Sequence, residues 1–347
     1  MSDYDKPPEL YDGLRLHQNE NTGGCSPRVL EALASLRADE ISVYPPYRAT
    51  IEACARHFGV DPGALALTNG LDEGIMAVAV AYLRPSGRLL APEAIVPAPA
   101  FEIFECSADV VGARVVSVAP RPDFAFALEE VLAAITERTR VVFLTNPNNP
   151  TGVLTPIEAI RAVAGRVPPG AVVFVDEAYA DFSGTTVVPE LAAHPNVIVG
   201  RTFAKAYGLA GLRLGAVIGA PAALAPVRRA IGVYSVNLAA VVAVKAALED
   251  PEHIRRYVRQ VDESKALLYE ACERLGLHYW KSAANFVLVR VGDRTPALVS
   301  LAASRGIYVR DRSTEPGCRG CVRITTGIVE HTRRFIAVLE EGLCAAR

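Results

Sequence analysis

The sequence lacks several features that would each indicate a class of protein. It has no apolar run long enough to cross a bilayer, no low-complexity tract and no internal repeat. Its 36 basic and 38 acidic side chains nearly balance, giving a formal net charge of -2. Neither nucleic acid nor an anionic membrane is therefore expected as a partner. The polar start, MSDYDKPPELYDG, does not follow the pattern of a signal peptide, so we expect a cytoplasmic protein.

Cysteines are few and scattered. Seven of them, an odd number, in 347 residues favour reduced thiols over a disulfide framework. Cys318 and Cys321 have the CxxC spacing of metal ligands, but the sequence contains no second CxxC and no HxxxH. A structural zinc ion needs four ligands, so we expect two incidental thiols near a turn and no metal. No GxGxxG follows the first expected strand, which argues against a dinucleotide-binding dehydrogenase.

The first two thirds of the chain alternate short apolar runs with helix-like segments. Several runs are apolar on consecutive residues, which is typical of parallel strands covered by helices on both faces. We expect strands at residues 64–68, 88–91, 114–118, 141–145, 172–175, 197–200 and 216–219, with helices at 72–83, 128–135 and 156–167 among the connections. The pattern predicts an α/β fold with a mostly parallel seven-stranded sheet. In such a sheet the ligand site lies at the carboxyl ends of the strands.

The pattern changes after Pro221, and the length also favours a second, smaller domain. We expect helices at 239–249, 251–276, 296–305 and 330–344, and strands at 285–291, 307–310 and 321–325. These elements predict an α+β unit. We place an N-terminal segment at residues 1–43, the large domain at 44–250 and the small domain at 251–347. Residues 26–38 are expected to pack with the small domain.

Polar residues gather where the expected strands end. The loop TNPNNPTG, residues 145–152, contains three asparagines, which is more than a strand-to-helix turn needs, although capping could explain them. Asp176 ends an apolar strand, and a half-buried carboxylate needs a cation or hydrogen-bond donors. Asp176 could instead be an ordinary helix N-cap, and taken alone these two interpretations are evenly balanced. Tyr179 follows three residues later and could face the same ligand.

Lys205 decides between these interpretations. It is the only lysine in GRTFAKAYGLAGLRLG, and a lone buried ammonium is costly unless it is paired, neutralised or used covalently. An aldehyde cofactor converts such a lysine into a Schiff base, and burial makes the amine nucleophilic near neutrality. Thr202, Arg213 and the backbone amides of Gly70-Leu71-Asp72, at a helix start, could hold a phosphate. Together these groups indicate pyridoxal phosphate, which needs an electron sink at its ring nitrogen.

The order NNPTG, DEAY and then a lysine followed by GLAGLRLG resembles the fold-type I, class I/II aminotransferases. Further segments are similar to the histidinol-phosphate aminotransferase subfamily over almost the whole chain: Asn19-Glu-Asn21, Tyr44-Pro45, Gly70-Leu-Asp-Glu-Gly74, Pro99-Ala-Phe101, Arg310-Asp311 and Cys321-Val-Arg-Ile-Thr-Thr-Gly327. The resemblance implies a fold-type I transferase that binds pyridoxal 5'-phosphate and forms a homodimer with shared active sites.

The resemblance also implies a role for individual residues. Lys205 would bind the cofactor covalently and act as general acid and base, and Asp176 would pair with the ring nitrogen. Asn149 and Tyr179 would contact the 3′ oxygen of the cofactor, and Phe101 would stack on its ring. The cofactor phosphate would be held by Gly70, Leu71, Asp72, Thr202 and Arg213, and by Tyr44 of the partner subunit. Arg310 and Arg323 would bind the acidic end of the substrate, and Asn19 lies on the segment that closes over it.

The implied reaction is ping-pong transamination of L-histidinol phosphate with a 2-oxo acid, 2-oxoglutarate, in histidine biosynthesis. Arginines that bind phosphate also bind carboxylate. An aromatic or broad-specificity aminotransferase, or a related enzyme acting on another phosphorylated amino acid, therefore stays an alternative. A ligand-sensing regulator is disfavoured, because the chain has no room for a DNA-binding module. Departures from the pattern are Phe101, where the family usually has Tyr, Ala204, where it usually has Ser, and His17-Gln18, where small residues are more usual.

Overall fold

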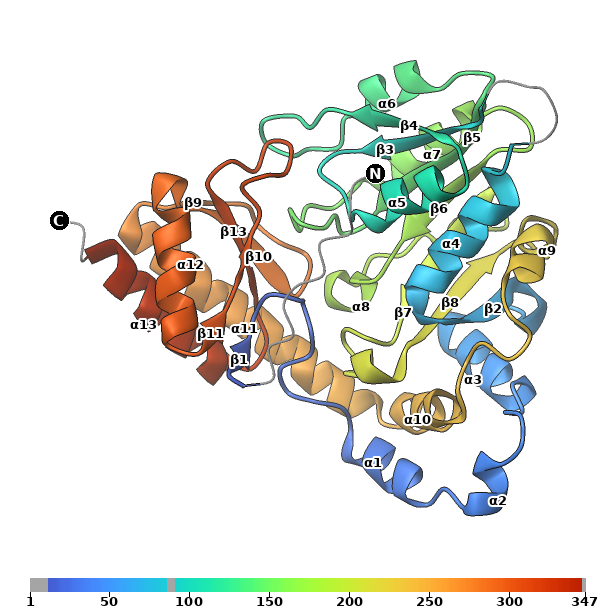
Figure 1. Ribbon diagram of the computed structural model, residues 1–347, viewed down its shortest axis with the longest axis horizontal. Coiled ribbons are helices and arrows are strands. Elements are labelled where there is room, and N and C mark those ends of the chain that lie inside the picture. Colours follow the sequence, from blue (N-terminus) through green and yellow to red (C-terminus); the bar gives the residue numbers. More distant parts are fainter. Residues whose placement is uncertain (1–11, 86–90, 345–347) are drawn as a thin grey trace.

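The computed structural model describes residues 12–85 and 91–344, which form a large and a small unit (Figure 1). The large unit is built on a seven-stranded sheet with the order β2-β8-β7-β6-β5-β3-β4. Both pairs made by β8 are antiparallel and the other four pairs are parallel. The predicted mostly parallel sheet is therefore confirmed. Its strands are β2 (Leu65–Asn69), β3 (Glu93–Pro97), β4 (Arg114–Val118), β5 (Thr139–Thr145), β6 (Val172–Asp176), β7 (Val197–Thr202) and β8 (Leu214–Gly219).

The central strands are apolar because helices cover the sheet. β6, β7 and β8 are buried at every position, as expected for strands that are enclosed on both faces. α4 packs on β8 and β2, α7 on β6, and α9 on β8. The helices of this unit are α3 (Arg48–Phe58), α4 (Gly70–Tyr82), α5 (Ile103–Val110), α6 (Leu128–Ala134), α7 (Ile157–Arg166), α8 (Ala180–Ser183), α9 (Pro221–Ala230) and α10 (Leu238–Leu248).

One expected strand lies at the gap between the two described ranges. The strand predicted at residues 88–91 falls mostly outside the described residues, of which 91 is the first after the gap. The strand between α4 and α5 is β3, at Glu93–Pro97. Its run Ala94-Ile-Val96 is fully buried between β4 and β5. Burial against both neighbours therefore selects this later apolar run as the strand.

The small unit is an α+β arrangement, as predicted. Its antiparallel sheet has the order β12-β13-β10-β9. The single strand expected at 307–310 is two short strands, because β11 pairs with the N-terminal strand β1 whereas β12 pairs with β13. The elements are β1 (Leu14–Arg15), α11 (Pro251–Leu275), β9 (His278–Tyr279), β10 (Phe286–Arg290), α12 (Thr295–Ser304), β11 (Ile307–Tyr308), β12 (Arg310–Asp311), β13 (Cys321–Thr325) and α13 (Val329–Cys344).

The long helix α11 connects the two units (Figure 1). Tyr257 and Val261 in its first half belong to the core of the large unit, whereas Leu268 and Cys272 belong to that of the small unit. The boundaries at 43/44 and 250/251 stay a proposal. None of the helices within residues 12–85 and 91–344 is long and apolar enough to cross a membrane.

The N-terminal segment is divided between the units. β1 lies in the small unit, but α1 (Pro27–Ala34) packs on α10, and its Val29 is part of the large core. The prediction that residues 26–38 pack with the small domain is therefore wrong. The physical reason is that α10 presents an apolar face, which covers the buried side of α1.

Candidate active site

Lys205 lies in the loop that follows β7. The neighbouring side chains Phe203 and Ala206 are fully buried and anchor this loop. The Lys205 Nζ donates a hydrogen bond of 2.9 Å to the carbonyl oxygen of Gln18. Burial and, to a smaller extent, the positive charge of Arg323 together lower the pKa of Lys205 to about 8. The amine is thus held by a neutral acceptor and is easier to deprotonate than an ordinary lysine.

Asp176 is the last residue of β6, and the sheet places it beside β7. Its Oδ1 accepts a hydrogen bond of 2.9 Å from the backbone N–H of Ala178. Burial raises the pKa of Asp176 to about 7. Its carboxylate therefore caps the local turn and also borders the same cavity as Lys205. The two interpretations of Asp176 are compatible, since one oxygen makes the turn contact.

Tyr179 is buried three residues beyond Asp176. Its hydroxyl accepts a hydrogen bond of 2.9 Å from Asn19 Nδ2, and burial raises the pKa of Tyr179. Asn19 has a positive φ of 55° and is fixed through Thr325, whose Oγ1 accepts from the Asn19 backbone N–H at 3.0 Å. The N-terminal segment therefore crosses from the small unit onto Tyr179.

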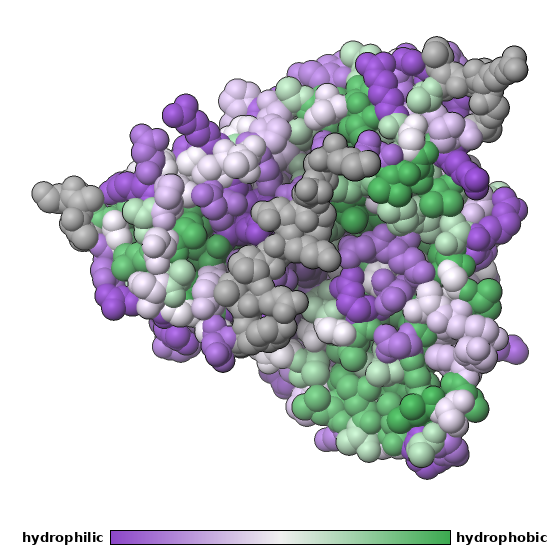
Figure 2. Space-filling view, in the orientation of Figure 1, coloured by the Kyte–Doolittle hydropathy of each residue, from purple (hydrophilic) through white to green (hydrophobic). Residues whose placement is uncertain are grey.

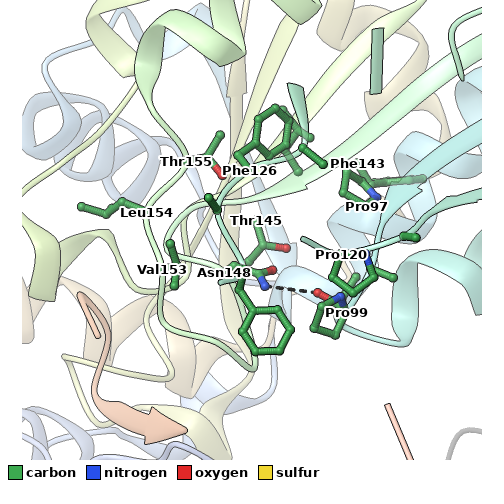
Figure 3. A pocket seen from close by; sticks show the side chains of 17 residues that line it. Pro97, Pro99, Pro120, Phe126, Phe143, Thr145, Asn148, Val153, Leu154 and Thr155 are labelled. Carbon is green, nitrogen blue, oxygen red and sulfur yellow. Dashed lines mark hydrogen bonds between the residues drawn. The ribbon is translucent and has the colours of Figure 1, made fainter. Parts of the chain in front are cut away.

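The three asparagines of the loop after β5 have different tasks. Asn146 Oδ1 accepts from the backbone N–H of Thr155 at 2.9 Å. Asn148 Nδ2 donates to the Pro99 carbonyl oxygen at 3.1 Å, across a small neighbouring pocket (Figure 3). These two are structural, as the capping interpretation proposed. Asn149 alone borders the cavity around Lys205.

A candidate cradle for an anion lies at the start of α4. Gly70 has a φ of +73°, and a Cβ there would lie 2.5 Å from Arg213 Nη2. Arg213 Nη2 donates to Asp72 Oδ2 at 2.7 Å. Thr202 Oγ1 accepts from the backbone N–H of Ala204 at 3.1 Å. The Gly70 backbone N–H donates to the Arg213 carbonyl oxygen at 2.9 Å, so the amides of Leu71 and Asp72 stay as the candidate donors of the helix N-terminus. Together with a guanidinium and a hydroxyl they favour an anion with several oxygens.

Arg323 on β13 supplies a buried positive charge opposite this cradle. It is 6% exposed and donates from Nη2 to the His17 carbonyl oxygen at 2.7 Å and from Nη1 to Asn149 Oδ1. Burial lowers the pKa of Arg323 to about 9, and the charges of Arg312 and Arg310 add to this effect. Arg310 is paired with Arg323 in the register of β12 and β13, so their side chains share one face of the sheet.

These side chains surround one cavity of about 500 Å³, within the range of ligand-binding sites. Two predicted site residues do not border it. Gly70 lies behind Arg213, and Tyr44 lies away from the cavity, 72% exposed and stacked on Tyr234 with ring centroids 4.0 Å apart. The structure brings the other twelve to its wall: Asn19, Leu71, Asp72, Phe101, Asn149, Asp176, Tyr179, Thr202, Lys205, Arg213, Arg310 and Arg323.

Residues 11–339 match the family of class I and II aminotransferases. The chain belongs to this family. A histidinol-phosphate aminotransferase of Symbiobacterium thermophilum is 37% identical over 347 residues, which cover 99% of this chain and 94% of that relative. One from Moorella thermoacetica is 36% identical over 96% of this chain and 86% of its own length. Among solved structures, the histidinol-phosphate aminotransferase of Sinorhizobium meliloti in complex with pyridoxal-5'-phosphate is 27% identical, with a TM-score of 0.87 over 97% of this chain and 92% of that chain.

The aminotransferase cavity also contains residues that were not predicted. Arg15, Glu20, Glu102 and Arg312 border it, and Arg15 forms an ion pair of 2.7 Å with Glu20. The signal that could have identified Arg312 is its position two residues after Arg310, because alternate residues of a strand point to the same face.

Cys318 and Cys321 take no part in this cavity. Both are buried in a small apolar cluster with Phe124, Trp280 and Leu288. Burial raises the pKa of Cys318 to about 12, so this thiol is unreactive. Among the residues that the structure describes, no group of His, Cys, Asp or Glu is arranged to hold a metal ion.

Proposed function

We propose that this aminotransferase exchanges the amino group of L-histidinol phosphate with 2-oxoglutarate, using pyridoxal 5'-phosphate, in L-histidine biosynthesis. The observation that carries the proposal is the pair of guanidinium groups, Arg310 and Arg323, on one sheet face at the wall of the Lys205 cavity. One arginine suffices for a carboxylate, whereas two suit a dianionic phosphate. The names of the relatives from Symbiobacterium and Moorella support the same substrate.

The cavity wall has the donor set that pyridoxal phosphate requires. The cradle at Gly70, which a Cβ would fill, lies beside the guanidinium of Arg213. A primary amine with a pKa lowered to about 8 and a carboxylate with a pKa raised to about 7 border the same cavity. We assign the cofactor phosphate to the α4 N-terminus, Thr202 and Arg213. Arg213 already donates a hydrogen bond to Asp72. We therefore propose that Asp72 and the cofactor phosphate both contact Arg213.

When bound, the cofactor supplies an electron sink for the electron pair left by deprotonation of the donor. Lys205 would hold the cofactor covalently. Once the amino group of the donor has taken its place, the freed Nζ would move the proton of the donor α-carbon, a role that a pKa near ambient pH favours. Asp176 would hold a proton on the ring nitrogen, which restores its own carboxylate to the ionised form. Tyr179 and Asn149 would contact the 3′ oxygen of the ring, and Phe101 would stack on the ring.

We further propose that the enzyme is a homodimer. An apolar region covers the end of the molecule that carries α1, α2 (Ala38–Ile41) and α10 (Figure 2). Leu30, Ile41 and Val43 are each more than 60% exposed, and Tyr44 and Tyr234 stack in the same part of the chain. Exposed apolar patches of this kind mark interfaces. A second copy bound there would bring Tyr44 toward the cofactor phosphate of its partner. The predicted cytoplasmic location is part of the same proposal.

The donor preference tests the proposed function. We expect a higher kcat/KM for histidinol phosphate than for phenylalanine. Arg310→Ala should lower kcat/KM for histidinol phosphate about 10- to 100-fold, because a charge-assisted contact is lost. It should change kcat/KM for phenylalanine much less. Asp311→Asn, on the neighbouring exposed position, is the control. If phenylalanine is the better donor, or if both donors lose activity equally, the enzyme is an aromatic aminotransferase.

A further inference from the structure

Arg312 extends the β12 arrangement by one strand repeat. The Arg312 backbone N–H donates to the Cys321 carbonyl oxygen at 2.9 Å, which continues the antiparallel pairing of Arg310 with Arg323. Since alternate residues share a face, Arg310 and Arg312 point the same way and Asp311 points the opposite way. Arg312, Arg310 and Arg323 all border the Lys205 cavity, and Asp311 does not.

Arg312 is buried although it carries a charge. It is 6% exposed and forms an ion pair with Glu315, which lies one turn further along the same loop. Within the part of the chain that the structure describes, Arg312 Nε, Arg323 Nε and Glu315 Oε2 are buried and have no hydrogen-bond partner. A buried ion pair stabilises a fold only when its remaining polar atoms are also satisfied. This pair is therefore costly as a structural feature alone.

The partners of Arg323 point to the same conclusion. Its guanidinium contacts two neutral oxygens, those of His17 and Asn149, although a second buried guanidinium borders the same cavity. Like charges in a water-poor site repel each other, and an anion between them would remove the repulsion. A phosphate end group has enough oxygens for all three arginines, whereas a carboxylate has two.

We propose that Arg312 is a third guanidinium of the subsite for the charged end of the amino donor, and that Glu315 holds it in position. Arg312 is then a specificity-determining residue: it strengthens binding of a dianionic phosphate more than binding of a monoanionic carboxylate. This inference rests on the proposed function and concerns the same cavity. It adds a residue that lies outside the Arg310 and Arg323 pair.

The test compares Arg312→Gln with Arg319→Gln in the enzyme loaded with cofactor. Arg319 is exposed on the same loop, so the control has the same change in net charge. We expect Arg312→Gln to raise the KM for histidinol phosphate about 10- to 100-fold while kcat stays within about twofold. The KM for phenylalanine should stay within about twofold, and Arg319→Gln should change neither constant.

Binding of inorganic phosphate to the loaded enzyme, measured by calorimetry, separates this inference from the proposed function. The cofactor already fills its own phosphate site, so the added phosphate reports on the donor subsite. Arg312→Gln should weaken this binding about 10-fold or more, whichever donor the enzyme prefers. If the wild type ignores histidinol phosphate but Arg312→Gln still weakens phosphate binding, the proposed function fails and the Arg312 subsite stands.

Three further variants test the contribution of Glu315 and the stability of the fold. Glu315→Gln should raise the KM for histidinol phosphate less than Arg312→Gln does, and the double variant should be no worse than Arg312→Gln alone. If Arg312→Gln does not fold, Arg312→Lys keeps the charge but loses the planar fork, and should raise the KM several-fold. Unchanged phosphate binding, or an equal rise in KM for both donors, in a folded Arg312 variant would overturn the inference.

Discussion

The low pKa of Lys205 predicts that this buried lysine destabilises the cofactor-free protein. The pKa of Lys205 is lowered from 10.5 to about 8 by burial, so the folded protein binds this proton more weakly than the unfolded chain does. The penalty on folding is complete below pH 8, shrinks between pH 8 and 10.5, and vanishes above that range. With these two values it is about 3 kcal/mol at pH 7 and about 1.5 kcal/mol at pH 9.5.

Lys205→Met removes the charge and keeps a side chain of similar length. Urea titration of cofactor-free protein should show that the variant is stabilised more at pH 7 than at pH 9.5, by about 2 kcal/mol. The lost hydrogen bond to the Gln18 carbonyl affects both pH values and largely cancels in this comparison. Lys281→Met, at an exposed lysine, is the control and should show no such difference. An equal change in unfolding free energy at both pH values would refute the low pKa.

Four further variants test the cofactor contacts and the interface. Ala204→Ser should slow the loss of cofactor during dialysis without changing donor preference, because the added hydroxyl can bond the phosphate, worth about 1.5–3 kcal/mol; equal retention would show that another group already fills that place. Asp176→Asn should retain cofactor but lower kcat about 10²- to 10⁴-fold in single-turnover spectra, because an amide cannot hold the ring nitrogen protonated by charge. Leu30→Arg should shift the mass in solution from that of a dimer to that of a monomer, and a Leu30→Arg variant that stays dimeric would place the interface elsewhere. Tyr44→Phe should keep the dimer and weaken cofactor retention.

The arrangement around Lys205 was predictable because it depends on local order along the chain. Asp176 and Thr202 each end a buried apolar strand, and Asn149 follows another. Parallel pairing places Thr145 beside Asp176 and Asp176 beside Gly200, so the ends of three strands meet at one edge of the sheet. Knowing that the strands are parallel is therefore enough to predict that these polar residues lie close together. The chemical roles of these residues stay predictions.

The features that were missed depend on contacts between distant segments. The Gln18 carbonyl meets Lys205 across 187 positions, and β1 pairs with β11 through only two residues. Strands of that length have no measurable periodicity, and a backbone carbonyl has no sequence signature. Arg312 was not among the predicted site residues, because the two-residue strand β12 has no sequence pattern that shows which way its side chains point. The β12–β13 register instead turns it into the cavity.

The three charged groups at the centre of the cavity share one physical property. Burial raises the pKa of Asp176 to about 7 and lowers those of Lys205 and Arg323 to about 8 and 9, so each group is shifted toward its neutral form. A cofactor with a protonated ring nitrogen and an aldehyde would supply Asp176 with a cation and convert Lys205 by a covalent bond. A donor with a dianionic end would give Arg323 an anion. Each interaction relieves a cost that the folded protein otherwise carries. The same burial that makes these groups reactive therefore makes the fold depend on its ligands for stability, and the free energy of unfolding should rise as cofactor and donor bind.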